Sequence, residues 1–183
     1  MKIIILGAGQ VGGSLAQNLV KEASDITLVD TDADRLRGLQ DRYDIRTVCG
    51  SASHPSVLRQ AGAEDADMLI AVTNSDKVKM VACQVAYSVF NTPTKISRVR
   101  SREYLAGGGI FRDDAMPVDH IVNPEEILTH DIKRLVDNPG ALQVMDFAGG
   151  QAKLVGLRID RGSPLANQTV STIRSLVDGV DAR

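Results

Sequence analysis

The sequence predicts an α/β fold built on a doubly wound, mostly parallel sheet of about six strands. Short apolar runs bounded by glycine or polar residues, such as KIIIL at residues 2–6, are typical of strands buried on both faces. Segments with apolar residues at helical spacing alternate with these runs, and a G-x-G-x-x-G turn joins the first run to the first helical segment. Such alternation with short connections favours right-handed crossovers between parallel strands.

The glycine-rich turn follows the first predicted strand directly. Gly7 permits a tight turn, Gly9 lets the backbone approach a diphosphate, and Gly12 lets the following helix pack against the strand. A diphosphate would lie against the N–H groups at the start of that helix, which is expected to begin near Gln10. The predicted diphosphate-binding residues are Gly7, Ala8, Gly9, Gln10, Val11 and Gly12.

The second predicted strand, residues 25–30, ends in an acid. The spacing from Gly12 to Asp30 is close to the ~20 residues expected for a carboxylate that binds ribose hydroxyls. Asp30 favours a ribose with a free 2′-hydroxyl and therefore NAD over NADP. The nearby Arg35 could pair with a 2′-phosphate, so NADP is not excluded. Thr31, next to Asp30, is also expected at the site. Asp30 does not separate NAD from ADP or ATP, which share the adenosine diphosphate. The alternative is a plain glycine turn with Asp30 as a helix cap.

The remaining elements of the first part follow from capping and periodicity. Thr31 with Asp34 resembles a capping box, and Ser53 with Pro55 predicts a helix that runs through Gln60. A longer helix is predicted from a stripe of five apolar residues: Val78, Val81, Ala82, Val85 and Val89. Strands are predicted at residues 45–49, 67–72, 95–99 and 118–122.

The loops at the carboxyl ends of these strands should converge on one crevice, since ligands of doubly wound sheets bind there. We expect Gly50, Ser51 and Ala52 beside the adenine, and Thr73 and Asn74 near the phosphates or second ribose. A strand-end turn and ordinary helix capping are the alternatives for these two loops.

A basic cluster ends the fifth predicted strand. Arg98 and Arg100 share one face of that strand by its period of two. On the crevice side, either guanidinium could hold a terminal phosphate or a nicotinamide-side group bidentately. A solvated edge is the alternative.

The organisation changes near residue 123. Asn123, Pro124 and two glutamates form a strong helix start, and residues 138–140 (NPG) stop that helix. Its apolar face runs from Ile127 to Val136 and is expected to meet a partner subunit or a second lobe, with packing inside the domain as the alternative. Strands are predicted at 142–147 and 153–159, and a short helix or strand at 170–177. We therefore expect a nucleotide-binding domain at 1–122, a crossover helix at 123–138 and, at 139–183, the truncated start of a small α+β lobe.

Composition narrows the function. The net charge of −2 and the absence of tryptophan argue against nucleic-acid binding, and no run approaches the ~20 apolar residues of a membrane span. The two cysteines, Cys49 and Cys83, have no CxxC spacing and are expected to be buried thiols in a reducing cytosol, with a disulfide as the alternative.

Catalytic constellations are missing from the sequence. No tyrosine is followed by lysine in the Tyr-x-x-x-Lys spacing of short-chain dehydrogenases, and the three histidines are isolated. Zinc-ligand spacing and a P-loop lysine are also missing, and no substrate domain follows residue 123. A binding module is therefore favoured over an enzyme. The alternatives are an NAD-dependent oxidoreductase without its catalytic domain and a DNA-binding redox sensor, which would need a basic helix-turn-helix.

Several segments together resemble the RCK or KTN domains, the regulatory nucleotide-binding domains of potassium channels and transporters. The resemblance rests on the glycine motif with Asp30, CGSAS at 49–53, LRQAGAEDADMLIAVTNSD at 58–76 and VNPEE at 122–126. It covers residues 1 to about 138 closely, and the tail resembles the beginning of the family's C-terminal lobe.

The resemblance implies a cytosolic regulatory subunit, peripheral on the inner face of the plasma membrane, that binds NAD(H) or ATP/ADP. It also implies dimers that assemble into a ring and gate a membrane potassium pore. By position, Asn74 would lie near the phosphates, and Arg100 near a distal phosphate or a subunit contact. Many relatives have Gly-Asp-Ala where this chain has Gly50-Ser51-Ala52, which leaves the preference between NADH and ATP open.

Overall fold

The computed structural model describes residues 1–22, 24–106, 110–111, 115–169 and 172. They fall into two compact units, Met1–Glu125 and Glu126–Arg183, and each unit is described by itself. The Gly107–Gly109 part of the sequence and, apart from Thr172, the element predicted at 170–177 lie outside the described residues.

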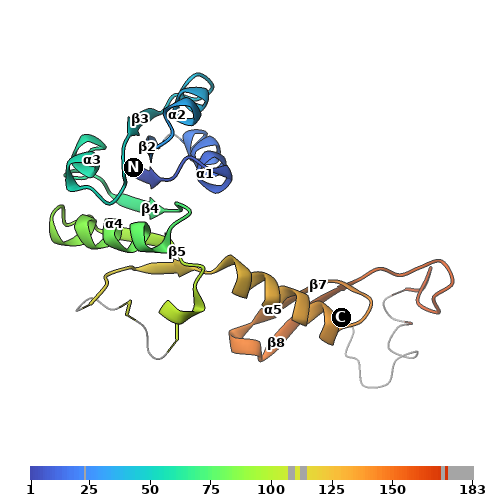
Figure 1. Ribbon diagram of the computed structural model, residues 1–183. Coiled ribbons are helices and arrows are strands. Elements are labelled where there is room, and N and C mark those ends of the chain that lie inside the picture. Colours follow the sequence, from blue (N-terminus) through green and yellow to red (C-terminus); the bar gives the residue numbers. More distant parts are fainter. Residues whose placement is uncertain (23, 107–109, 112–114, 170–171, 173–183) are drawn as a thin grey trace. The chain divides into compact units, whose positions relative to one another are not determined.

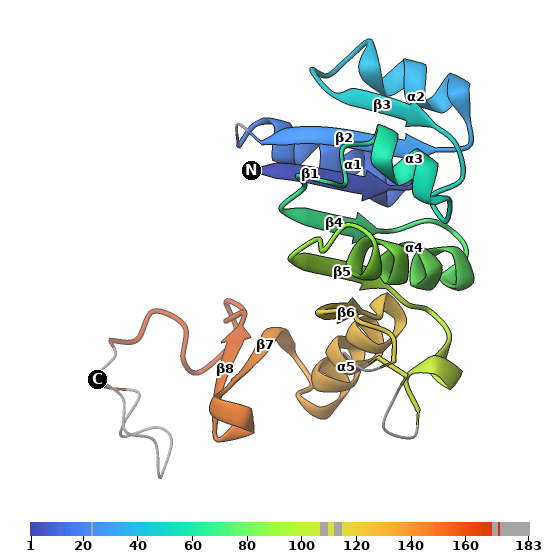
Figure 2. The ribbon, with the colours of Figure 1, turned by 90° about the vertical axis from the view of Figure 1, so that its left-hand side faces the viewer.

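The first unit is a six-stranded, fully parallel sheet with strand order β3-β2-β1-β4-β5-β6 (Figures 1 and 2). This order confirms the predicted doubly wound sheet. The chain adds β2 and β3 on one side of β1 and then β4 to β6 on the other, so the strand order switches between β1 and β4. The observed strands start or stop within two residues of the predicted ones. They are β1 (Lys2–Leu6), β2 (Asp25–Asp30), β3 (Arg46–Cys49), β4 (Met68–Ala71), β5 (Thr94–Arg98) and β6 (His120–Val122).

Two helices cover each face of the sheet, as the end-on view of Figure 1 shows. Successive side chains of β1 point to opposite faces of the sheet. Ile3 and Ile5 pack toward α1 (Gln10–Val20) and α2 (Ala33–Gln40), whereas Ile4 and Leu6 pack toward α3 (Pro55–Gln60) and α4 (Asp76–Ser88). All four side chains are at most 2% exposed, which explains why β1 is continuously apolar.

Two predicted helix caps are wrong by one residue. Asp32, not Thr31, caps α2, because its extended backbone directs its carboxylate Oδ1 to the Arg35 N–H at 3.0 Å. His54, not Ser53, precedes α3, since Pro55 already occupies the first helical position. Neighbouring polar residues can each serve as a helix cap, so a sequence pattern fixes the end of a helix only to within one or two residues. The two helices were therefore predicted correctly, but their capping residues were not.

Two other expectations about burial are corrected. Val81 and Val89 of the predicted stripe are 45% and 47% exposed, because α4 buries its smaller residues Ala82, Cys83 and Ala86 against the sheet. Cys49 is exposed, since it ends the edge strand β3, while Cys83 is buried as expected.

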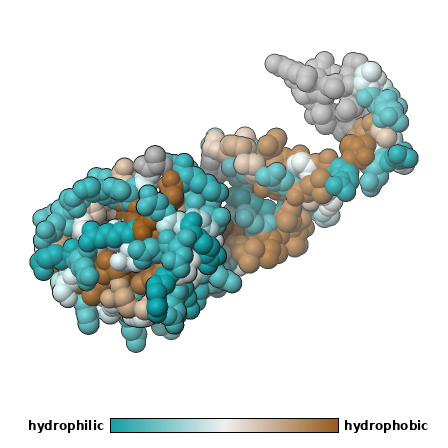
Figure 3. Space-filling view, turned by 90° about the horizontal axis from the view of Figure 1, so that it is seen from above, coloured by the Kyte–Doolittle hydropathy of each residue, from teal (hydrophilic) through white to brown (hydrophobic). Residues whose placement is uncertain are grey.

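The second unit holds the greater part of α5 (Pro124–Asp137) and an antiparallel pair, β7 (Ala141–Phe147) with β8 (Ala152–Leu157). Arg134 Nε of α5 lies 2.8 Å from Asp146 Oδ2 of β7. Apolar side chains crowd the surface of α5, β7 and β8, seen as brown atoms in Figure 3. Among the described residues, no helix combines the length and apolarity needed to cross a bilayer.

Candidate functional site

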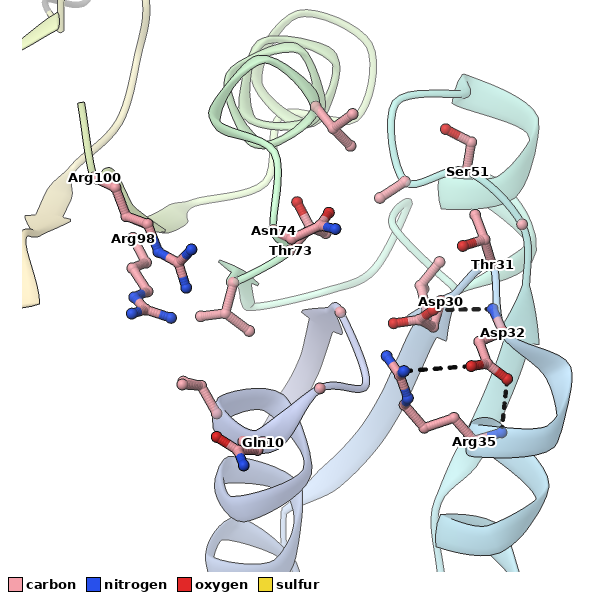
Figure 4. A pocket seen from close by; sticks show the side chains of 18 residues that line it. Gln10, Asp30, Thr31, Asp32, Arg35, Ser51, Thr73, Asn74, Arg98 and Arg100 are labelled. Carbon is pink, nitrogen blue, oxygen red and sulfur yellow. Dashed lines mark hydrogen bonds and ion pairs between the residues drawn. The ribbon is translucent and has the colours of Figure 1, made fainter. Parts of the chain in front are cut away.

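A cavity of about 540 Å³ lies at the carboxyl ends of β1 to β5, where the predicted loops converge (Figure 4). Every residue predicted for the site lines it except Ala8 and Gly12. Four lining residues were not predicted: Val29, Asp32, Val72 and Val78. The three valines carry no chemical signal in the sequence, but Asp32 could have been found as the first acid after β2, two residues beyond Asp30.

Two glycines of the turn are required by the fold itself. Gly7 has φ +106°, and a Cβ there would lie 2.9 Å from the backbone nitrogen of Thr73. A Cβ on Gly12 would lie 1.7 Å from the carbonyl oxygen of Gly7. Gly12 therefore lets α1 start directly against the end of β1.

Gly9 differs from both, because a Cβ there would lie within 4 Å of no atom of the described residues other than its chain neighbours. Its φ of −69° suits any residue, so the fold gives no reason for glycine at this position. Gly9 precedes α1 without a side-chain cap, and the first turn of α1 holds no acid, whereas Asp32 and Ser75 cap α2 and α4. The start of α1 thus offers backbone N–H donors and open space, which fits a diphosphate.

Asp30 links the glycine turn to the end of β2. Its Oδ2 accepts the Ala8 N–H at 2.6 Å and its Oδ1 accepts the Asp32 N–H at 2.9 Å. Each carboxylate oxygen can accept a further hydrogen bond. The carboxylate therefore lines the cavity in a fixed orientation, able to accept from ribose hydroxyls.

Asp32 and Arg35 form the rim beside Asp30. Arg35 Nη2 lies 3.4 Å from Asp32 Oδ2, and both side chains are about half exposed (Figure 4). The ion pair neutralises the guanidinium that a 2′-phosphate would otherwise use. With two carboxylates and a paired arginine, this end of the cavity suits an unphosphorylated ribose.

The middle of the cavity is lined by small polar residues from two loops. Ser51 lies 3.0 Å from the Ser53 hydroxyl, and Ala52 is buried. Thr73 donates its hydroxyl to the Ser75 carbonyl at 3.2 Å. The helix cap of α4 is Ser75, so Thr73 and Asn74 are not the capping residues that the alternative required.

Arg98 and Arg100 form the opposite end, and Figure 4 shows both side chains across the cavity from Asp30. Val99 between them is fully buried, so the period of two turns both arginines to the same side. Arg98 Nε is buried and makes no hydrogen bond within the described part of the chain. A buried guanidinium nitrogen without a partner fits an incoming anion.

Taken along its length, the cavity joins a carboxylate end, a stretch of backbone N–H donors and a double-arginine end. A nucleoside with a diphosphate and a further charged group matches this order. Among the described residues, no three His, Cys, Asp or Glu side chains cluster as metal ligands. Cys83 lies outside the cavity lining, and burial raises the pKa of its thiol to about 12.

The sequence matches the TrkA-N domain family over residues 3–124. A Trk system potassium uptake protein TrkA from Halomonas elongata is 57% identical over 183 residues, all of this chain and 40% of that protein. The chain thus spans well under half the length of that relative.

Solved structures share the fold. The TrkA-N domain of the inner membrane protein YbaL from Escherichia coli is 19% identical with a TM-score of 0.61, over 74% of this chain and 96% of that one. The GsuK channel, solved with NAD and with ADP, is 21% identical in both structures with a TM-score of 0.56. The match covers 69% of this chain and 22% or 32% of those chains. The resemblance to RCK or KTN domains is confirmed by the family match, and the chain belongs to the TrkA-N domain family.

Proposed function

We propose that this chain is the nucleotide-binding regulatory part of a potassium uptake system, taking NAD(H) and ADP or ATP in one cavity. The observation that carries the proposal is the order of groups along that cavity: Asp30, the backbone N–H groups near Gly9, and then Arg98 with Arg100. A relative named as a potassium uptake protein supports the transport role, and a channel with the same fold, solved with NAD and with ADP, supports both ligand classes.

Regulation would follow from differential binding. NAD(H) and ATP share the adenosine and diphosphate but bring different groups to Arg98 and Arg100. A ligand shifts an equilibrium between two conformations only by the difference between its affinities for them. The arginine end is therefore where the two ligand classes would produce different states.

The partners we propose are a membrane potassium-transporting subunit and further copies of this chain. The exposed apolar face of α5 supports dimers that assemble into a ring, and the protein would work in the cytoplasm, peripheral to the inner face of the membrane. We propose no chemical step in the cavity, because both oxygens of Asp30 already accept hydrogen bonds from backbone N–H groups. An oxidoreductase without its catalytic domain is the competing proposal.

The test is calorimetric titration of the chain with NAD, NADH, ADP and ATP, with light scattering for molar mass. We expect both ligand classes to bind with micromolar dissociation constants, which correspond to binding free energies on the order of −8 kcal/mol. We also expect binding to change the molar mass of the assembly. Binding of NAD(H) alone, with ADP and ATP silent, would favour the oxidoreductase.

An Arg100→Ala variant tests the differential step. It should lower the affinity for ATP by about tenfold, and so reduce the difference between the affinities for the two ligand classes. Arg102→Ala is the matched control, because Arg102 is exposed and lies outside the cavity lining. Unchanged curves for every nucleotide in Arg100→Ala would remove the arginine end from the mechanism.

A further inference from the structure

We infer that Asp76, held by the buried ammonium of Lys79, is the residue that positions Arg98 and Arg100 for the distal group of the ligand. The inference deepens the proposed function, on which its ligand readout rests. Neither Asp76 nor Lys79 lines the cavity, so both would act on the ligand only through other residues.

The geometry starts at the carboxylate of Asp76, in the first turn of α4. One of its oxygens, Oδ2, accepts the backbone N–H of Arg100 at 3.1 Å and that of Ser101 at 2.9 Å. Asp76 follows the loop of Thr73 and Asn74 by only two residues. A single carboxylate thus joins the loop after β4 to the segment after β5, and these are two walls of one cavity.

The other oxygen of Asp76 is held from inside the protein. Oδ1 lies 2.6 Å from Nζ of Lys79, whose side chain is 0% exposed, while that of Asp76 is 13% exposed. Burial raises the pKa of Asp76, but the adjacent Lys79 ammonium and the hydrogen bonds from the Ser101 and Arg100 amides outweigh it and hold that pKa below its ordinary value of 3.8. The carboxylate is therefore charged near neutral pH and stays fixed between Lys79 and the two amides.

The segment that Asp76 holds is also fixed on its other side. The Val99 N–H donates to the Val122 carbonyl of β6 at 3.0 Å, and the Val99 side chain is fully buried. The chain from Arg98 to Ser101 is thus anchored at three consecutive amides. With Val99 turned inward, this anchoring directs the side chains on either side of it, Arg98 and Arg100, into the cavity.

Stability alone is a weak reason for such a pair. A buried ion pair is generally no more stabilising than apolar residues of similar volume, because both charges must leave water. Two apolar side chains could fill the space, but they could not hold the amides of Arg100 and Ser101. The function that requires a carboxylate here is the positioning of the arginine segment.

The experiment compares wild type with Asp76→Ala/Lys79→Met, which removes the acceptor and leaves no unpaired buried cation. Lys79→Met alone is the matched control, since it keeps the acceptor for both amides. Asp76→Asn/Lys79→Met, which keeps one acceptor oxygen, is the second variant in case the first does not fold. Titration with AMP and ATP gives the ratio of affinities, and amide hydrogen exchange follows Arg100 and Ser101 without ligand.

In Asp76→Ala/Lys79→Met we expect the preference for ATP over AMP to fall by about tenfold, with AMP affinity within about twofold of wild type. The Arg100 and Ser101 amides should exchange at least about tenfold faster than in Lys79→Met. Asp76→Asn/Lys79→Met should show a smaller loss in the same direction. Wild-type ratios and protection in either folded double variant overturn the inference.

The two readouts separate this inference from the proposed function. If wild type binds neither nucleotide, the proposed function fails, while the amide exchange still decides whether Asp76 holds the segment. An equal loss of AMP and ATP affinity would show a general structural role and would also overturn positioning.

Discussion

The backbone N–H of Ala8 donates a 2.6 Å hydrogen bond to Oδ2 of Asp30, joining the glycine turn to the end of the neighbouring strand. The second oxygen of Asp30 accepts from Asp32 at 2.9 Å. The acid expected to bind ribose therefore also builds the cavity into which the ribose would fit. Loop order and ligand recognition depend on the same side chain.

Asp30→Ala should reduce both stability and binding. Two part-buried amides lose their acceptor, which costs about 2 kcal/mol of unfolding free energy, measured by urea denaturation. ADP affinity should fall more than about tenfold. Asp25→Ala, at the exposed start of the same strand, is the control and should change neither quantity. Retained ADP affinity in folded Asp30→Ala would remove Asp30 from the ribose site.

Gly9→Ala should separate binding from folding. In the part of the chain that the structure describes, an added Cβ meets no atom within 4 Å beyond its chain neighbours, so the loss of stability is at most about 1 kcal/mol, as for other changes at a helix start. The methyl group would occupy the space next to the α1 amides, and nucleotide affinity should fall more than about tenfold.

The control for Gly9→Ala is Gly13→Ala in the same helix. A Cβ on Gly13 makes an ordinary contact, 3.6 Å from Leu39, and alanine should stabilise the helix by about 0.5 kcal/mol without affecting binding. If Gly9→Ala binds nucleotides like Gly13→Ala, the diphosphate does not lie at the start of α1.

The sequence predicted the sheet and most of the cavity for physical reasons that particular residues make clear. Buried parallel strands are apolar throughout, and the turn needs glycine at Gly7 and Gly12 for steric reasons that any similar sequence shares. Lys79 could not be found in this way. Its full burial depends on Asp76, Arg100 and Ser101 meeting in space, and a lysine in an amphipathic helix is ordinarily solvated.

Asp32→Ser should weaken the discrimination against NADP. Serine keeps the helix cap, while the change removes one carboxylate from the rim and frees Arg35, now 3.4 Å from Asp32, to meet a 2′-phosphate. The ratio of NAD to NADP affinity should fall by about tenfold in parallel titrations. Asp34→Ser is the control, because Asp34 pairs with Arg37 outside this cavity. An equal change in both variants would point to net charge alone.

Asp119 should make stability depend on pH through its ion pair with Lys95. Lys95 Nζ, with a side chain only 4% exposed, lies 2.9 Å from Asp119 Oδ2. Burial raises the pKa of Asp119, but hydrogen bonds from the Lys95 ammonium and backbone N–H hold it below 3.8. Because the folded-state pKa is the lower one, the contribution is complete above 3.8 and disappears as the pH falls through the folded value.

Asp119→Asn leaves the Lys95 ammonium without a counter-charge, and should cost about 2 kcal/mol of unfolding free energy at pH 7. The difference from wild type should shrink on acidification, because protonated Asp119 is also neutral. Urea denaturation between pH 7 and pH 3 measures both effects. A difference that stays constant across this range would show that the charge of Asp119 does not matter.

The apolar face of α5 gives the last prediction, which concerns assembly. Leu128 and Val136 are 61% and 70% exposed, and Ile127, Ile132 and Leu135 on the same helix are each at least 42% exposed. Burying such side chains against a second copy would yield about 1.5–3 kcal/mol for each one fully removed from water.

Leu128→Arg/Val136→Arg should therefore lower the molar mass measured by light scattering toward that of a single chain, with unchanged circular dichroism. Lys133→Glu, an exposed change on α5 outside the apolar set, should leave the mass unaltered. If the double variant keeps the wild-type mass, the copies associate through another surface and α5 is free to meet a different partner.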